Sequence, residues 1–229
     1  PSWSRSRAEA YISASPSCAT ATRTTPSWSQ SRAEAAGATF RAVSGFEAPD
    51  WFGAVGASDL GWGEPAFFDA WKAEHGAVRE RAGLVDMSFM SKFAVAGRDA
   101  ERVLQRLSTA DVSAGITYTQ WLRDSTGTLE ADLTVTRLPA RWADATGLAP
   151  RFGDADTADP FLVVATDTAH RHVLALLRRE IRGDEVVAFA DVTGGLAQLA
   201  LQGPRSRDIL RAAVSGAGDG DVPADLPFR

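Results

Sequence analysis

The chain has very few of the residues that build disulfides and metal sites. Its 229 residues include one cysteine, Cys18, so neither an intrachain disulfide nor a CxxC metal pair is possible. Two of its three histidines, His170 and His172, stand two apart in a segment predicted to be helical, where such neighbours point in different directions. The sequence therefore favours surface histidines over a metal site, and we expect no bound metal.

Basic runs, long apolar runs and phosphate-binding glycine motifs are also missing. The net charge is −5 and no basic stripe is present, so nucleic acid is not expected as a partner. No apolar run approaches the roughly 20 residues that a membrane span needs, and the N-terminus has no apolar signal region. No G-x-G-x-x-G follows a predicted strand, so no flavin domain is expected in this chain. The sequence predicts a cytoplasmic protein.

A repeat marks the first part of the chain. PSWSRSRAEA at Pro1–Ala10 returns as PSWSQSRAEA at Pro26–Ala35, with a Ser-, Thr- and Ala-rich stretch between them. Two copies are too few to stack as a solenoid, and we interpret residues 1–24 as a low-complexity, disordered segment. Residues 25–60 are expected to form an irregular, aromatic-rich lead-in, and residues 61–229 the folded domain.

Hydrophobic periodicity in the folded part alternates between helical and strand patterns. Helices are predicted for the segments that begin EPAFFDAW, DAERVLQRL, TAHRHVLAL and SRDILRAAV, with Asp99 and Ser206 as N-caps and Gly83 as a C-terminal cap. Strands are predicted for FAVAG, TYTQWL, LEADLTVTRL, FLVVAT, EVVAFADVT and LAQLALQG. The Pro-, Ala-, Asp- and Gly-rich stretch 139–160 is expected to be a mobile insertion. This order predicts an α+β fold with a mainly antiparallel sheet and packed helices.

The strongest strand signal is a hairpin, TYTQWL and LEADLTVTRL, joined by turn residues around Gly127. On its second strand Glu130, Asp132 and Thr134 alternate with apolar residues, so all three are expected on one face. Two neighbouring carboxylates on one face repel, which predicts a raised pKa for one of them.

Two interpretations of this hairpin are open from the pattern alone. In the first, the polar face is solvated while Leu129, Leu133 and Val135 point inward, and Tyr118 packs in the core. In the second, the polar face binds a ligand and Tyr118 forms an aromatic wall. The pattern by itself favours the solvated face.

Six motifs resolve this ambiguity by resemblance. FEAPDWF, WGEPAFFDAWKAEHGAVRERAGLVDMSFMSKFAVAG, YTQWL, EADLTVTRL, FLVVAT and ALQGPRSRDIL follow one another as in the dimethylglycine/sarcosine dehydrogenase branch of the glycine cleavage T-protein (aminomethyltransferase) family. The resemblance runs from about Thr25 to the C-terminus, interrupted by the insertion. It implies the N-terminal portion of a T-protein-type, folate-binding fold. It also implies transfer of a one-carbon unit from an aminomethyl or iminium donor to tetrahydrofolate.

The resemblance also implies residue roles on the hairpin. Asp132 matches the family's key carboxylate, which contacts the reduced pterin and helps its proton leave as the new C–N bond forms. The physical logic fits, because an amine that attacks an electrophilic carbon becomes cationic and a nearby anion stabilises that charge. Tyr118, Glu130 and Thr134 are then expected to contact the folate beside Asp132.

Several features depart from the family pattern. The hairpin turn reads STGTL where the family has a Gly-Gly pair, and it is one residue longer, which is expected to shift Asp132. The chain stops at DLPFR, where the family continues, so lobes that complete the folate pocket are expected to be missing. Arg205 is expected to be a solvated helix-start residue rather than a contact for the folate tail, and Trp62 and Trp71 to be core aromatics.

Three functions remain in view. The leading one is part of a folate-dependent aminomethyltransferase or N-methyl amino acid dehydrogenase, with the FAD in a separate domain. Its partners would be an N-methyl amino acid or aminomethyl donor, together with a flavin domain or the missing lobes. The alternatives are a non-catalytic folate-binding or assembly module, and an incomplete, inactive fragment.

Overall fold

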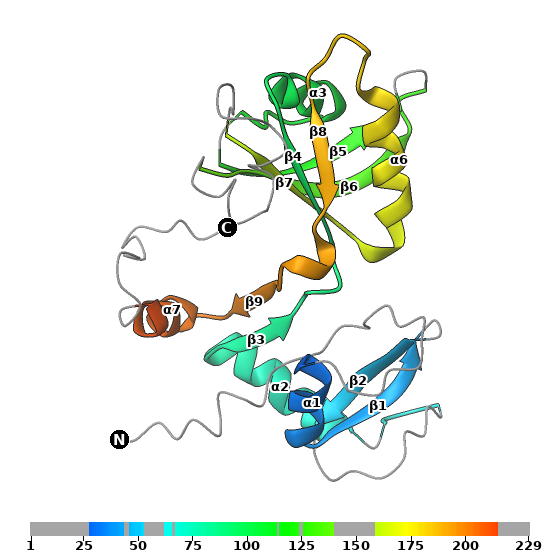
Figure 1. The fold of residues 1–229 in the computed structure, drawn as a ribbon. Coiled ribbons are helices and arrows are strands. Elements are labelled where there is room, and N and C mark those ends of the chain that lie inside the picture. Colours follow the sequence, from blue (N-terminus) through cyan, green and yellow to red (C-terminus); the bar gives the residue numbers. More distant parts are fainter. Residues whose placement is uncertain are drawn as a thin grey trace. The chain divides into compact units, whose positions relative to one another are not determined.

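The computed structural model describes residues 28–43, 46–52, 62–65, 67–113, 115–123, 126–139 and 159–214 (Figure 1). The chain divides into two compact units: unit 1 is formed by Pro1–Met87 and Leu199–Arg229, and unit 2 by Ser88–Gln198. The predictions for residues 1–24 and for most of the 139–160 insertion lie outside the described residues.

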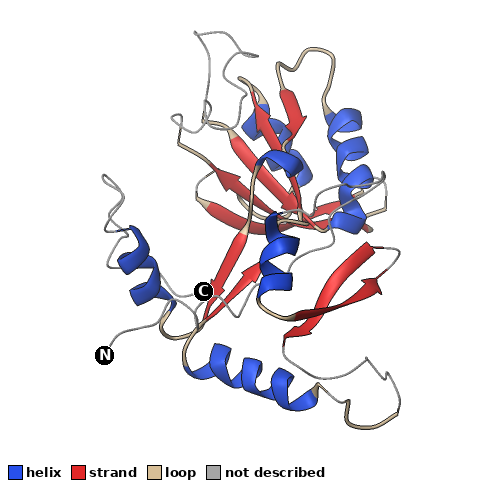
Figure 2. Ribbon diagram, turned by 60° about the horizontal axis from the view of Figure 1, so that its bottom comes forward, coloured by secondary structure: helices blue, strands red, loops and turns tan. Residues whose placement is uncertain are grey.

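The described part of unit 1 contains helices and two small antiparallel sheets (Figures 1 and 2). Its helices are α1 (Trp28–Ala35), α2 (Phe68–Glu80) and α7 (Ser206–Val214), and its strands are β1 (Ala38–Val43), β2 (Phe46–Phe52), β3 (Gly83–Asp86) and β9 (Leu199–Gln202). Strand β1 pairs with β2, and β3 pairs with β9. The stretch predicted to be irregular therefore holds a helix and a hairpin. Trp51 anchors it, because its ring is 2% exposed and stacks on Phe67 with centroids 4.7 Å apart.

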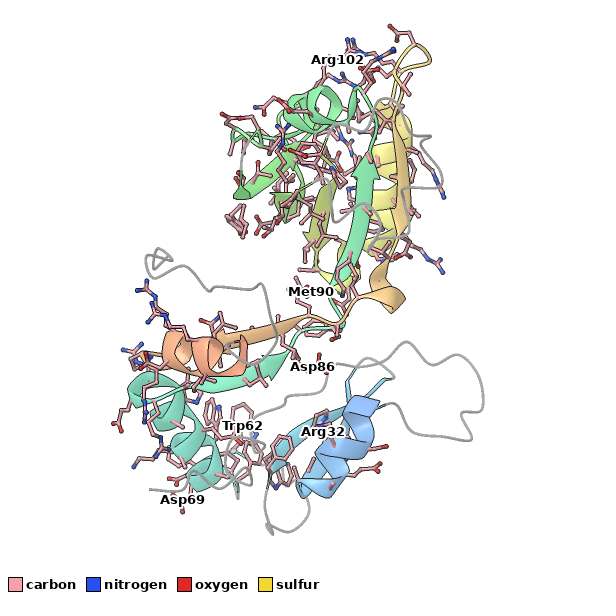
Figure 3. All side chains as sticks on the ribbon, turned by 60° about the vertical axis from the view of Figure 1, so that its left-hand side comes forward. Arg32, Trp62, Asp69, Asp86, Met90 and Arg102 are labelled. Carbon is pink, nitrogen blue, oxygen red and sulfur yellow. The ribbon has the colours of Figure 1, made fainter. Side chains whose placement is uncertain are left out.

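Three predictions for unit 1 are wrong. Trp62, labelled in Figure 3, is fully exposed. Trp71 is 49% exposed, so neither is a core aromatic. Trp71 packs edge-on against Phe68 and His75 of its own helix, whose only buried residue is Ala77. Gly83 does not cap α2, because the C-cap is Arg81 and Gly83 already starts β3.

Gly203, in the LQGP motif, has a specific backbone role in unit 1. Its φ is +108°, a region that residues with a side chain rarely adopt. A Cβ there would lie 2.6 Å from the Val78 carbonyl oxygen and 2.8 Å from that of Arg81. The glycine thus lets the start of α7 approach the end of α2, where the Arg205 N–H donates to the Arg81 carbonyl at 2.8 Å.

The described residues of unit 2 form a five-stranded antiparallel sheet with two α-helices. The strand order is β5-β6-β7-β4-β8. The strands are β4 (Ser91–Ala96), β5 (Ile116–Leu122), β6 (Leu129–Arg137), β7 (Phe161–Ala165) and β8 (Ala188–Asp191), the helices are α3 (Ala100–Leu107) and α6 (His170–Glu180), and two short 3-10 turns are η2 (Asp167–Ala169) and η3 (Thr193–Gly195). Every strand pair is antiparallel. The predicted α+β class with a mainly antiparallel sheet is confirmed.

The two faces of this sheet differ in composition because side chains alternate along each strand. One face, which we call the helix face, packs against α3 and α6. Its core includes Phe93, Val95, Trp121, Leu133, Val135, Phe161, Val163, Val173 and Leu177, all at most 2% exposed. The intervening residues form the opposite face, which includes Thr134, Leu162 and Val164 and carries the polar side chains of the hairpin.

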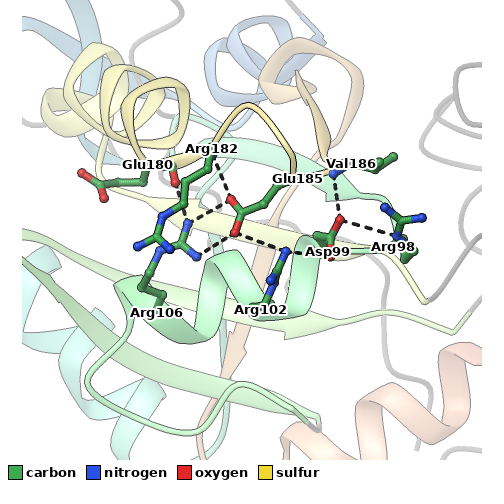
Figure 4. Close-up of polar contacts among 8 residues, drawn as sticks. All are labelled: Arg98, Asp99, Arg102, Arg106, Glu180, Arg182, Glu185 and Val186. Atoms are coloured by element: carbon green, nitrogen blue, oxygen red, sulfur yellow. Dashed lines mark hydrogen bonds and ion pairs between the residues drawn. The ribbon is translucent and has the colours of Figure 1, made fainter.

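An ion cluster around the buried carboxylate of Glu185 joins α3 to the loop between α6 and β8 (Figure 4). The Glu185 carboxylate accepts hydrogen bonds from both terminal nitrogens of the Arg106 guanidinium, at 2.8 and 3.0 Å. It also accepts one from the Arg182 backbone N–H at 2.9 Å. Arg102 completes the cluster at 3.5 Å. These contacts, led by the hydrogen bonds from Arg106, lower the pKa of Glu185 to about 2.

Asp99 occupies the predicted N-cap position of α3, but its carboxylate makes no capping hydrogen bond to the helix. It instead accepts a hydrogen bond from the Val186 N–H at 2.8 Å, which links the start of α3 to the loop that precedes β8. Gly97 makes this approach possible: its φ is +126°, and a Cβ there would lie 2.3 Å from the Val186 carbonyl oxygen.

Candidate functional site

The β5–β6 hairpin holds the carboxylate of Asp132 by both oxygens. Gln120 lies directly opposite Asp132 in the strand register, and its amide nitrogen donates to Oδ1 at 3.2 Å. The Tyr118 hydroxyl donates to Oδ2, and this hydrogen bond raises the pKa of Tyr118. Asp132 remains exposed, and Tyr118 is 60% exposed. The hairpin therefore presents an oriented, accessible carboxylate beside an accessible aromatic ring.

Thr134 lies next to this group, and Tyr118 does not pack in the core. Tyr118 pairs across the ladder with Thr134, two residues beyond Asp132 on β6. Residues two apart on a strand share one face. The structure therefore brings together three of the four residues proposed from the sequence: Tyr118, Asp132 and Thr134.

Glu130 is separated from them by a β-bulge, so the prediction that it shares the face of Asp132 is wrong. Leu122 pairs with Leu129 but Trp121 pairs with Ala131, which leaves Glu130 as an extra residue on β6. Its side chain is 5% exposed and contacts His172 of α6, which packs on the helix face, at 2.6 Å. The bulge breaks the period of two, and Leu129, predicted to point inward, is 62% exposed.

The carboxylate of Glu130 pairs with Arg123 and contacts His172, rather than being crowded by Asp132. The Arg123 guanidinium donates a short hydrogen bond to Oε1, and His172 contacts Oε2. The hydrogen bond from Arg123 is the main reason that the pKa of Glu130 is lowered. The predicted rise in pKa from two facing carboxylates therefore does not occur at Glu130.

The two histidines of α6 point in different directions, as predicted. The His170 ring lies between Ser91 Oγ, 2.9 Å from Nδ1, and the Asp191 carboxylate, 3.0 Å from Nε2. His172 reaches Glu130 instead. Over the described parts of the chain, no cluster of three His, Cys, Asp or Glu residues is placed to hold a metal ion. No helix among those residues is long and apolar enough to cross a bilayer.

A pocket of about 350 Å³ lies on the face opposite the helices. It is lined by Lys92, Thr134, Thr136, Leu162, Val164, Leu196, Ala197 and Gln198. Lys92 is 2% exposed, and its ammonium group donates to the Met90 carbonyl at 2.7 Å and the Ser88 carbonyl at 3.0 Å. Apolar walls with a few polar groups are typical of small-molecule sites. Thr134 belongs both to this pocket and to the polar group around Asp132.

The sequence interpretation missed two residues of this site. Gln120 holds Asp132, and the period of two from Tyr118 already placed it on the same face. Lys92 is the only charged residue in β4, a signal that also was available in the sequence. Arg205 belongs to unit 1 and is exposed, in agreement with a helix-start residue.

The family follows from comparison with known proteins. The model of the GCVT N-terminal domain matches residues 29–143 and 155–228. The chain therefore belongs to the GCVT, or aminomethyltransferase-type, family, and the resemblance to this family inferred from the six motifs is confirmed.

Named relatives include enzymes of two kinds. The chain is 38% identical to a 4-methylaminobutanoate oxidase (formaldehyde-forming) of Paenarthrobacter nicotinovorans over 76% of this chain and 19% of the oxidase. It is 37% identical to a probable aminomethyltransferase of Halobacterium salinarum over 70% of this chain and 40% of the relative. It is 35% identical to an aminomethyltransferase of Rubrobacter xylanophilus over 78% of this chain and 43% of the relative.

A solved structure shares the fold. The aminomethyltransferase T of the glycine cleavage system from Bartonella henselae superposes with a TM-score of 0.56 at 24% identity, over 87% of this chain and 44% of that one. At this identity the likeness concerns the fold. The chain spans less than half the length of each of these relatives.

Proposed function

We propose that this domain binds tetrahydrofolate on the face opposite the helices and serves one-carbon transfer to it, forming methylenetetrahydrofolate in the whole protein. One observation carries the proposal: an accessible Asp132 carboxylate, held by Tyr118 and Gln120, stands beside a partly apolar pocket. Pockets that hold small molecules are commonly about 300–1,000 Å³. The volume of about 350 Å³ therefore suits one planar ring system.

The residues present fit a reduced pterin. Leu162 and Val164 offer apolar walls, Thr134 offers a hydroxyl, and Tyr118 offers an exposed ring on the same side. A flat ring with polar edges is held by such a combination of apolar contact and a few hydrogen bonds. Glu130 does not join this set, because the bulge directs it to His172.

The chemistry assigned to the chain rests on Asp132. Tetrahydrofolate, when bound, supplies the nucleophilic amine that takes up the one-carbon unit. The Asp132 carboxylate stabilises the positive charge that develops on an attacking amine and accepts its proton at Oδ1 or Oδ2. Gln120 and Tyr118 hold these two oxygens in one orientation, which limits the reorganisation needed during the reaction.

The amine donor and the redox partner are further parts of the proposal. Similarity to a formaldehyde-forming 4-methylaminobutanoate oxidase supports an N-methyl amino acid as the source of the one-carbon unit. Similarity to aminomethyltransferases supports an aminomethyl donor. In the first case an FAD-bearing domain separate from this chain would oxidise the amine.

Titration of the chain with tetrahydrofolate, followed by calorimetry and tryptophan fluorescence, tests the binding. We expect saturable binding that Asp132→Ala weakens, while the control Asp167→Ala, on an exposed residue of η2, leaves it unchanged. In a whole protein that carries this domain, Asp132→Asn should lower the rate of transfer by about 10²–10⁴-fold. Absence of binding to the folded chain would contradict the folate assignment, and unchanged transfer would contradict the role of Asp132.

A further inference from the structure

The exposed side of α6 carries two arginines in line. Arg171 and Arg178 lie seven residues apart on this helix, with Ala175 between them, and all three residues are exposed. Positions four and seven residues apart follow one line along a helix surface. At a rise of about 1.5 Å per residue, the two arginines stand about 10 Å apart along the axis. We call Arg171, Ala175 and Arg178 the arginine row, and Arg182 follows it beyond the end of the helix.

The other described arginines of unit 2 behave differently, because each forms an ion pair with a carboxylate. They are Arg98, Arg102, Arg106, Arg123, Arg137 and Arg179. Within the part of the chain that the structure describes, no carboxylate lies within ion-pair distance of Arg171, Arg178 or Arg182. In a chain with a net charge of −5, unpaired positive charge is therefore gathered on one side of one helix.

The stability of α6 does not account for the arginine row. Cations near the C-terminal end of a helix interact favourably with its dipole, which gives Arg178 a local role. Arg171 is the second residue of α6, at the end where the dipole favours anions, and the first turn holds no acidic residue. Arg171 is thus unfavourably placed within its own helix, which points to an anion supplied by another molecule.

The surroundings of the row indicate which kind of anion fits. The large apolar residues Val173, Leu176 and Leu177 are buried in the core, so the exposed side of α6 has no such side chain to insert into a bilayer. The net charge of −5 disfavours an extended polyanion such as nucleic acid. A protein helix with a few carboxylates meets less repulsion. The small side chain of Ala175 lets such a helix approach closely between the two arginines.

We propose that the arginine row of α6 is a docking surface for an acidic α-helix of a partner protein. Carboxylates seven residues apart on that helix pair with Arg171 and Arg178, and the residue between them packs on Ala175. The row belongs to the helix that covers the core side of the sheet, whereas the pocket lies on the opposite face. The inference therefore goes beyond the proposed function and does not depend on it.

Fluorescence anisotropy of labelled peptides, titrated with the 229-residue chain at low salt, tests this surface. One alanine-rich peptide of about 18 residues carries glutamates along one helical line, and a second has the same composition with its glutamates spread around the helix. Arg171→Glu/Arg178→Glu reverses the charge of the row. Lys72→Glu/Arg79→Glu is the matched control, because these exposed residues of α2 are also seven apart.

We expect the first peptide to bind about 5-fold more tightly than the second, since only its charges match the row. Reversing the row should weaken the first peptide by about 10-fold, and added salt should weaken the wild-type complex. The α2 control should retain the wild-type affinity. The reversed row should instead bind a peptide in which lysines replace the glutamates, which also shows that this variant is folded.

The outcomes decide between partners. No binding, equal binding of the two glutamate peptides, or equal losses in the two double variants would overturn the docking surface. Tighter binding of an oligothymidylate or of phosphatidylserine vesicles than of the first peptide would overturn it as well, because the row would then serve nucleic acid or lipid. A loss confined to the reversed row, with recovery by the lysine peptide, supports the proposal.

Discussion

The two faces of the sheet in unit 2 arise from the same strands but have different tasks. On the helix face, alternate residues of β4, β6 and β7 are fully buried against α3 and α6 and form the core. On the opposite face, the intervening residues of β6 and β7 are exposed or partly buried and include Thr134 and the oriented Asp132, whereas those of β4 are buried. The difference teaches that stability and proposed chemistry are carried by alternating positions of one strand, so single substitutions can separate them.

A substitution on the helix face should have the largest effect. Phe93→Ala removes a fully buried ring from the centre of the core, and we expect a loss of about 3–5 kcal/mol in the free energy of unfolding. Val164→Ala, on the opposite face of the neighbouring strand, should cost clearly less because that residue is only half-buried. Urea unfolding of both variants measures the difference, and equal losses would contradict the separation of the faces.

A smaller loss of stability is expected at Gly97, the glycine that lets the loop before β8 approach the start of α3. Gly97→Ala places a Cβ within 2.3 Å of the Val186 carbonyl and forces a left-handed residue to carry a side chain. A cost of about 1–3 kcal/mol follows from the backbone conformation alone. Gly183→Ala is the control, since a Cβ there meets nothing within 4 Å. Thermal unfolding should therefore show a clear drop for Gly97→Ala and little change for Gly183→Ala.

The ion cluster on α3 predicts a dependence of stability on pH. Because the pKa of Glu185 is about 2 in the folded protein against an ordinary value of 4.5, its ionised form stabilises the fold above the higher value. This contribution is lost as the pH falls from about 4.5 toward about 2. The melting temperatures of wild type and Glu185→Gln should thus differ at neutral pH and converge in acid. A gap that stays constant would show that the charge of Glu185 is unimportant.

The smallest effects are expected among the neighbours of Asp132. Tyr118→Phe removes one hydrogen bond to an exposed carboxylate, and we expect tetrahydrofolate affinity to fall by a few-fold. Glu130→Gln loosens the bulge without touching the pocket, so it should leave that affinity nearly unchanged and slightly lower the melting temperature. Parallel titrations compare the two. A larger loss of affinity for Glu130→Gln than for Tyr118→Phe would return Glu130 to the ligand-binding face.

Local pattern was enough to predict much of this fold. The period of two along LEADLTVTRL placed Leu133 and Val135 in the core, where both are buried, and Asp132 and Thr134 opposite them. The helical stripe of α3 likewise placed Val103, Leu104 and Leu107 inward. These signals succeed because an element that buries one face must repeat its apolar residues at its own period.

Local pattern failed where a residue's environment depends on distant contacts. The aromatic residues Trp62 and Trp71 looked like core, yet exposure depends on which surfaces pack against them. Gln120 and Lys92 were overlooked because a strand pattern does not indicate which polar side chains will meet a carboxylate or line a pocket.

The sequence by itself determined the α+β class, the family and the hairpin that carries Asp132, because these depend on periodicity and on motifs in a fixed order. Only the tertiary structure decided between the two carboxylates of that hairpin. Asp132 stays in register opposite Gln120, whereas a bulge removes Glu130 from the alternation and gives it to Arg123 and His172. The physical reason is that an unpaired strand residue follows no period, and its direction is set by its partners: Arg123, which follows the other strand of the hairpin, and His172, on a helix 42 residues away.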